Sequence, residues 1–197
     1  MMTNTKKIEQ IIEKTLNESS KTIESLADLS NEIDKIVNLI IKALTKNKKI
    51  IILGNGGSAA DAQHIAAEFL GRYKLKRKSI PAVALTSNSS TTTAIANDYD
   101  FSDIFSRQCE SLVSKDDIVI GISTSGNSQN VIKGLKTSKK NGGSTIGLLG
   151  NNGGKIKNIV DIPLVVNSTS VPRIQEAHRV IYHIICEIVE EELAGIE

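Results

Sequence analysis

The strongest constraint on the fold is an alternation, from Lys49 onward, between short apolar runs and longer stretches with helical periodicity. The apolar runs are rich in Ile, Val and Leu and lie at 48–53, 81–85, 116–123, 144–150 and 161–166. The helical stretches lie near 59–73, 102–113 and 128–141, and a last one covers about 171–193. Strands that are apolar along their whole length are typical of a parallel sheet buried between helical layers. The pattern therefore predicts a three-layer α/β/α sandwich with a parallel five-stranded sheet.

The N-terminal quarter of the chain has a different pattern. Residues 5–47 carry apolar side chains at spacings of three and four, which predicts helix. A chain of 197 residues fits one domain. We expect a single domain over 1–197, with an N-terminal helical oligomerisation arm at 1–47 and an α/β core at 48–197. The arm is too long for a small domain to cover, so packing against another subunit is a natural use for it.

Composition and charge exclude several functions. The net charge is only +2 and aromatic residues make up 3% of the chain, which argues against nucleic acid as a partner. Cys109 and Cys186 lie far apart without a CxxC spacing, so we interpret them as structural thiols. The polar N-terminus is no signal peptide, and the apolar runs are too short to span a membrane. We therefore expect a cytoplasmic protein.

The first predicted strand ends in a glycine-rich loop, GNGGSAADAQH (54–64). Its glycines let a ligand approach the main chain closely, and Ser58 opens a helix whose free N–H groups favour anions. The loop lacks the GKS or GKT of a nucleotide P-loop and breaks the dinucleotide pattern GxGxxG, so we expect no nucleotide cofactor. Taken alone, the loop also fits an ordinary tight turn between strand and helix.

A second loop, STSGNSQN (123–130), joins the third predicted strand to a helix. Hydroxyl groups gathered at a helix N-terminus can cradle a phosphate without any lysine or arginine. The four hydroxyl side chains of this loop are those of Ser123, Thr124, Ser125 and Ser128. A simple helix cap needs one such residue rather than four, so the sequence favours phosphate binding.

A third segment at the end of a predicted strand, 86–101, is also rich in hydroxyl side chains. Runs of Ser, Thr and Asn are usually loops, and we expect a loop here. Asn97 and Asp98 near its end are suited to binding sugar hydroxyls.

Two pairs of polar residues could carry chemistry. His64 and Glu68 are four residues apart on one predicted helix, so they share a face. Gln175 and His183 are eight apart on the last helix and also share a face, whereas His178 points elsewhere. The pairs suit either acid–base catalysis by Glu68 and His183 or the binding of a metal such as zinc. Spacing alone leaves these two roles open beside a purely structural one.

Four segments together resemble a known family, the phosphoheptose isomerases (sedoheptulose 7-phosphate isomerases) of the SIS (sugar isomerase) domain superfamily. They are GNGGSAADAQHIAAEFLGR, AIANDYDF, GISTSGNSQNV and RIQEAHRVIYHIICEIVE. The resemblance covers nearly the whole chain. It implies the flavodoxin-like SIS fold and a homotetramer with active sites between subunits in the bacterial cytoplasm.

The resemblance also implies an activity. Members convert sedoheptulose 7-phosphate to D-glycero-D-manno-heptose 7-phosphate through a cis-enediol, the first step towards nucleotide-activated heptose for lipopolysaccharide or capsule. The family's acid–base pair falls on Glu68 and His183. Its zinc ligands, one ion per site, fall on His64, Glu68, Gln175 and His183. Its substrate contacts fall on Asn55, Gly56, Gly57, Glu68, Asn97, Asp98, Ser123, Thr124, Ser125, Ser128 and Gln175.

The main alternative is a non-catalytic relative with the same fold, a tetramer that acts as a replication-initiator-associating binding protein. The presence of Glu68, Gln175 and His183 together argues against it, because a binding protein has no use for them. A sugar-phosphate-sensing module of a regulator ranks lower, since the sequence contains no helix-turn-helix pattern.

Overall fold

Five parallel strands form the centre of the fold in a computed structural model, which describes residues 4–194. They are β1 (Ile50–Gly54), β2 (Ala82–Ala84), β3 (Ile118–Ser123), β4 (Ser144–Leu149) and β5 (Ile162–Val165). Their order is β2-β1-β3-β4-β5, with Ile50 in register with both Ala82 and Ile118. All residues of β1 and β3 are buried, which explains why their sequences show no alternation. The predicted five-stranded parallel sheet and its flavodoxin-like order are confirmed.

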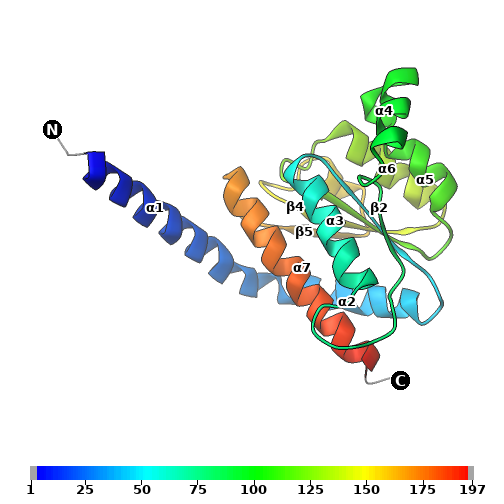
Figure 1. The fold of residues 1–197 in the computed structure, drawn as a ribbon, viewed down its shortest axis with the longest axis horizontal. Coiled ribbons are helices and arrows are strands. Elements are labelled where there is room, and N and C mark those ends of the chain that lie inside the picture. The colour runs from blue at the N-terminus through cyan, green and yellow to red at the C-terminus, as the bar shows by residue number, and fades with distance from the viewer. Residues whose placement is uncertain (1–3, 195–197) are drawn as a thin grey trace.

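Helices cover both faces of this sheet (Figure 1). Side chains of β1 alternate between two hydrophobic clusters, with Ile50 and Ile52 in one and Ile51 and Leu53 in the other. The first cluster includes residues of α2 (Ser30–Leu44), α3 (Gly57–Leu70) and α7 (Val171–Ala194). The second includes residues of α5 (Ser106–Leu112) and α6 (Gln129–Lys140). The predicted three-layer sandwich is therefore confirmed.

Short 3-10 helices complete the chain at Ser25–Leu29, Phe101–Asp103 and Ile156–Asn158. Within the described part of the chain, no helix is both long enough and apolar enough to cross a membrane.

The first helix, α1 (Asn4–Glu24), extends away from the rest of the molecule (Figure 1). Its C-terminal part contacts α7, where the Ser19 hydroxyl donates a hydrogen bond to Glu176 at 2.7 Å. Its outer part exposes a row of apolar side chains: Ile8, Ile11, Ile12 and Leu16. By contrast, α2 packs against α7 and the sheet. The described part of the expected arm, residues 4–44, thus consists of a projecting helix and a packed one, joined by a short 3-10 helix.

One expectation was wrong: the segment 86–101 is not a loop throughout, because it contains the helix α4 (Ser89–Asp98). Asn88 caps this helix by accepting a hydrogen bond from the Thr91 N–H at 3.0 Å. The hydroxyls of Thr92 and Thr93 donate to carbonyls four residues back. These local bonds stabilise the helix. The sequence did not predict it because Ser, Thr and Asn have low helix propensity.

Both cysteines are free and buried, Cys109 beside α6 and Cys186 on α7. Burial raises the pKa of the Cys109 thiol to about 11 and that of Cys186 to about 12. Both thiols therefore stay protonated at neutral pH, as expected of structural residues.

A buried ion pair ties the ends of α3 and α7 together. Arg77 donates from Nε to Glu190 on α7 at 2.9 Å, and its other nitrogens donate to the carbonyls of Glu68 and Phe69 in the last turn of α3. Glu190 also accepts bonds from three successive backbone N–H groups, at 73–75. Burial acts to raise the pKa of Glu190, but these N–H donors and Arg77 outweigh it and lower that pKa. We call this pair the Arg77–Glu190 clamp.

Replacing Glu190 by Gln should lower the free energy of unfolding by about 3–5 kcal/mol, because the charge of Arg77 would remain buried without its partner. Chemical denaturation at pH 7 measures this change. Glu187→Gln is the control: Glu187 pairs with Lys74 at the surface, so its loss should cost about 1 kcal/mol or less.

The clamp also predicts a dependence on pH. A carboxyl group whose pKa is lowered in the folded state stabilises the fold above its unfolded pKa of about 4.3, and that stability is lost as the pH falls through the folded pKa. Wild type should therefore lose more stability than Glu190→Gln between pH 6 and 3. Equal losses would contradict the role of the clamp.

Candidate active site

His64, Glu68 and His183 lie together where α3 meets α7. His64 Nε2 is 2.9 Å from Glu68 Oε1, as their spacing of four on α3 predicts. His183 reaches the same place from α7, with its ring centroid 5.2 Å from that of His64. One potential ligand atom from each of the three residues lies within 4.8 Å of the others. Two imidazoles and a carboxylate at this separation form a plausible donor set for a divalent metal such as zinc.

The surroundings of His183 favour the neutral form of its ring. The ring packs against those of Tyr182 and Tyr73, with centroids 4.7 and 5.6 Å away. Burial lowers the pKa of His183, and the neighbouring His64 lowers it further. A neutral imidazole is the form that binds a metal or accepts a proton.

The second nitrogen of His64 is held by residues that the sequence analysis missed. His64 Nδ1 lies 3.0 Å from the Tyr182 hydroxyl, which is 3.4 Å from Oδ1 of Asp61. Arg179 donates to the same oxygen at 3.2 Å. Helical spacing could have found Asp61, which lies three residues before His64, whereas Tyr182 reaches His64 from another helix and spacing gives no signal for it.

The glycine-rich loop after β1 lies against α7. A side chain at Gly57 would collide with the amide of Gln175, so only glycine allows this contact. Gly56 has a φ of +55°, a conformation that also favours glycine. Gln175 and His183 are eight residues apart, which places them about 12 Å apart along α7. Gln175 is therefore positioned at the glycine loop, at a distance along the helix from the three clustered residues.

The loops after β1 and β3 are linked to each other. The side-chain amides of Asn55 and Asn130 donate to one another's oxygens, at 2.8 and 2.9 Å. These strands lie at the point where the strand order reverses direction, the position at which ligands bind in folds of this type. The paired amides fix the spacing of the two loops at that point.

Three serine hydroxyls converge in the loop after β3. Ser123 Oγ lies 3.1 Å from Ser128 Oγ and 3.5 Å from Ser125 Oγ. Ser128 precedes α6 in the N-cap position, yet its hydroxyl makes no capping bond within that helix. The Ser123 and Ser125 oxygens also accept bonds from the N–H groups of Gly126 and Asn127. The three hydroxyls therefore hold the loop together at the N-terminus of α6, where the helix dipole favours an anion. Thr124 contributes its carbonyl to Asn151, at 2.8 Å.

Two predicted substrate contacts lie apart from these groups. Asn97 and Asp98 are exposed at the C-terminal end of α4 and hydrogen-bond to each other at 2.9 Å. Among the described residues, no hydrogen bond joins them to the serine loop or to the three clustered residues.

The third histidine, His178, is fully buried, and its Nε2 donates to the Leu149 carbonyl at 3.1 Å. As predicted from its position on the helix, it points away from His183. Its role is structural.

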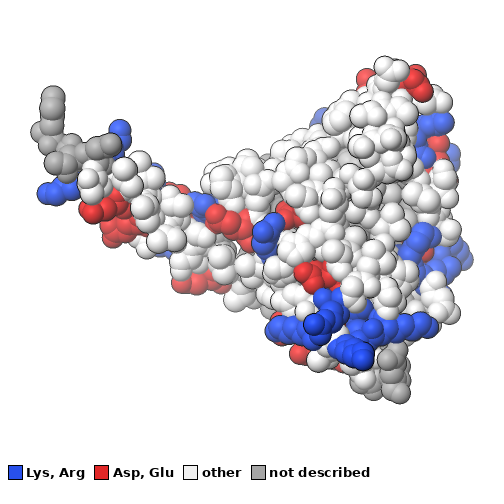
Figure 2. Space-filling model, in the orientation of Figure 1, with Lys and Arg blue, Asp and Glu red and all other residues white. Residues whose placement is uncertain are grey.

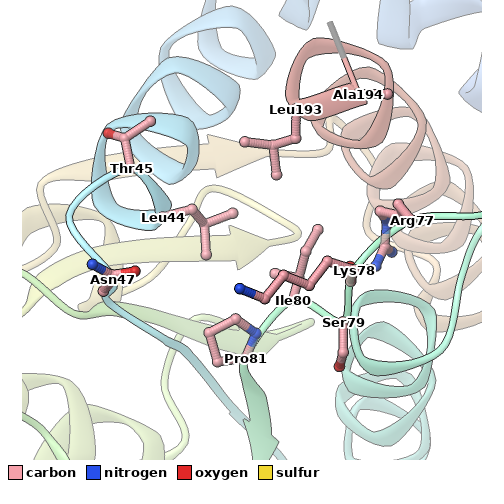
Figure 3. Close-up of a pocket in the computed structure, with 10 residues that line it drawn as sticks. All are labelled: Leu44, Thr45, Asn47, Arg77, Lys78, Ser79, Ile80, Pro81, Leu193 and Ala194. Carbon is pink, nitrogen blue, oxygen red and sulfur yellow. Dashed lines mark hydrogen bonds between the residues drawn. The ribbon is translucent and has the colours of Figure 1, made fainter. Parts of the chain in front are cut away.

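A cavity of about 450 Å³ lies at the opposite edge of the sheet (Figure 3). It is lined by residues just before β1 and β2, such as Asn47 and Pro81, and by Leu193 near the end of α7. Lys and Arg side chains gather near this end of α7 (Figure 2), and the adjoining connection 71–81 exposes several of them. None of the predicted site residues lines this cavity.

The fold and the loops at its strand ends agree with a known domain class. The family model described as SIS domain matches residues 6–150, about three quarters of the chain. The chain is a SIS-domain protein.

Its relatives define the family more closely. A phosphoheptose isomerase from Geotalea daltonii is 49% identical over 185 residues, covering 93% of this chain and 96% of that protein. One from Clostridium acetobutylicum is 52% identical over 164 residues, covering 83% and 84%. The solved structure of phosphoheptose isomerase from Neisseria gonorrhoeae superposes with a TM-score of 0.89 at 37% identity, covering 93% of this chain and 99% of that one. The chain belongs to the phosphoheptose isomerase family, a family of isomerases.

The contact between Gly57 and Gln175 yields a test by double-mutant cycle. Gly57→Ala should destabilise the fold by about 1 kcal/mol, because the flexible Gln175 side chain has to move its terminal amide out of the way of the added methyl group. In a Gln175→Ala background the same change should cost about 1 kcal/mol less, because the obstructing side chain is gone. Chemical denaturation of the four proteins measures the coupling. Additive effects would show that the two residues do not touch.

Proposed function

We propose that this chain converts sedoheptulose 7-phosphate into D-glycero-D-manno-heptose 7-phosphate, the first step in making nucleotide-activated heptose. The observation that carries the proposal is the convergence of Glu68 and His183 from separate helices, in a chain about half identical to phosphoheptose isomerases. The converging serines of the loop after β3 support a substrate that carries a phosphate.

The chemistry needs two proton-transfer groups. Glu68 removes a proton from C1 of the ketose while His183 exchanges protons with the neighbouring oxygens, which gives a cis-enediol between C1 and C2. Return of the proton to C2 then yields the aldose. A carboxylate and a neutral imidazole that share one site are suited to these steps.

The phosphate is bound by Ser123, Thr124, Ser125 and Ser128 with the N-terminal N–H groups of α6. We assign the sugar contacts to Asn55, Gly56, Gly57, Asn97, Asp98 and Gln175. Because hydroxyls and helix N–H groups supply the donors, the phosphate needs no lysine or arginine.

The three clustered residues fit a divalent metal by donor type and separation. In this proposal His64, Glu68 and His183 hold one Zn²⁺ per site. The Gln175 side chain of the same chain lies at the glycine loop, so the expected fourth ligand, Gln175, would have to come from another subunit. A bound Zn²⁺ supplies Lewis-acid polarisation of the substrate carbonyl.

We further propose a homotetramer in the bacterial cytoplasm, with α1 packed against another subunit. The exposed apolar row on α1 supports this, since side chains such as Ile12 and Leu16 are 53% and 64% exposed in the single chain. Burial of such a row between subunits is favourable.

Glu68→Gln should lower kcat by at least about 100-fold, because the amide cannot accept the C1 proton. Binding of the substrate should be largely retained. The assay follows sedoheptulose 7-phosphate and its product by NMR, with Glu110→Gln on the surface of α5 as the control. If wild type forms tetramers yet converts no substrate, the non-catalytic alternative replaces this proposal.

Ile8→Glu combined with Ile12→Glu should convert tetramers into smaller species, because two charges would interrupt the apolar row. Light scattering coupled to size-exclusion chromatography measures the mass. The control, Lys7→Glu with Lys14→Glu, introduces the same side chains at exposed polar positions of α1. An unchanged mass for the first variant would contradict an interface on α1.

A further inference from the structure

A continuous chain of polar contacts runs behind His64. It begins at Arg179 on α7, passes through Asp61 on α3 and the Tyr182 hydroxyl on α7, and reaches His64 Nδ1. On its other side, His64 Nε2 faces Glu68 at 2.9 Å. Asp61 and Tyr182 are nearly inaccessible, with 3% and 2% of their surface exposed. These two polar groups cross a contact between helices that is otherwise mainly apolar.

The positions of the protons follow from what each group can donate. The Asp61 carboxylate, paired with Arg179, can only accept hydrogen bonds. The Tyr182 hydroxyl has one proton, and it satisfies the buried carboxylate when it donates to Asp61. Its oxygen then accepts from His64, which places a proton on Nδ1. If Tyr182 instead donated its proton to His64, lone pairs of the tyrosine oxygen and of the Asp61 carboxylate would face each other in a buried place, which is unfavourable.

This arrangement has a consequence at the other nitrogen. When a neutral His64 carries its proton on Nδ1, a lone pair on Nε2 faces the carboxylate of Glu68. Two acceptors at hydrogen-bond distance repel each other unless a proton or a metal cation lies between them. His183 completes the group around that position.

We propose that Tyr182, Asp61 and Arg179 are positioning residues, which fix His64 as the Nδ1–H tautomer so that Nε2 is presented to a divalent cation shared with Glu68 and His183. This inference rests on the proposed function for the identity of the metal, Zn²⁺. A ligating histidine whose second nitrogen is anchored in this way keeps its orientation and tautomer. Arg179, whose side chain is 55% exposed, holds Asp61 from the solvent side.

The test removes one hydroxyl. Tyr182→Phe should bind Zn²⁺ about 10- to 100-fold more weakly than wild type, as measured by competition with a chromophoric chelator. In metal-free protein labelled with ¹⁵N-histidine, the wild-type His64 ring should keep its proton on Nδ1 by NMR, with or without a second proton on Nε2 towards Glu68. Tyr182→Phe should show a mixture of tautomers. The chain has only three histidines, so a His64→Asn variant assigns the signal.

Tyr73→Phe is the matched control, since it removes a hydroxyl from the other tyrosine that packs against His183. It should leave the Zn²⁺ affinity and the His64 tautomer unchanged. If Tyr182→Phe does not fold, Asp61→Asn tests the same chain, because a neutral amide anchors the tyrosine proton less strongly. It should also weaken Zn²⁺ binding and mix the tautomers.

A folded Tyr182→Phe protein with wild-type Zn²⁺ affinity and an unchanged His64 tautomer would overturn the proposal. Failure of wild type to bind Zn²⁺, or an Nε2–H tautomer in wild type, would also overturn it. These readouts are independent of turnover. A wild-type protein that binds Zn²⁺ with His64 in the Nδ1–H form but does not isomerise the sugar would refute the proposed function alone.

Discussion

The packing of α7 against α3 is the contact on which the site depends. Small buried residues of α3, Ala62 and Ala66, share one hydrophobic cluster with Ile181 and Ile185 of α7, so the two helices approach closely. The Arg77–Glu190 clamp fixes the same pair of helices at the C-terminal end of α3. A shift of either helix would separate His183 from His64 and Glu68. The apolar packing and the Arg77–Glu190 clamp, which stabilise the fold, therefore also set the positions of His64, Glu68 and His183.

The parallel sheet places the two loops of the proposed substrate site next to each other. Because parallel strands present their carboxyl ends at one edge, the glycine loop after β1 and the serine loop after β3 are neighbours. The paired amides of Asn55 and Asn130 then fix the distance between these loops. The proposed phosphate-binding groups are thereby tied to the strand whose following helix carries Glu68. In the proposed function, a sugar phosphate held at the serine loop would lie at a fixed distance from α3.

Sequence patterns predicted the strands well because β1, β3 and most of β4 are buried on both faces and consist mainly of apolar residues. The helix α4 was missed, since its stability comes from the Asn88 cap and hydroxyl bonds rather than from apolar periodicity. Spacing within one helix placed His64 beside Glu68 correctly. It could not place Tyr182 against His64, because that contact depends on how two helices cross. Spacing offered His183 and Glu68 only as one possible acid–base pair, and the family resemblance was what favoured that pairing before the structure brought the two residues together.

The two roles proposed for Glu68 compete, since a carboxylate that shares its electron pairs with a metal is a weaker base. The two carboxylate oxygens of Glu68 have different surroundings in the structure. Oε1 faces His64, whereas Oε2 takes part in no hydrogen bond among residues 4–194. One oxygen can therefore serve as the ligand while the other accepts the substrate proton. The proposed tautomer of His64 agrees with these separate roles of the two oxygens. With its proton on Nδ1, His64 has no proton on Nε2 to exchange with the substrate. Proton transfer is then left to Glu68 and His183.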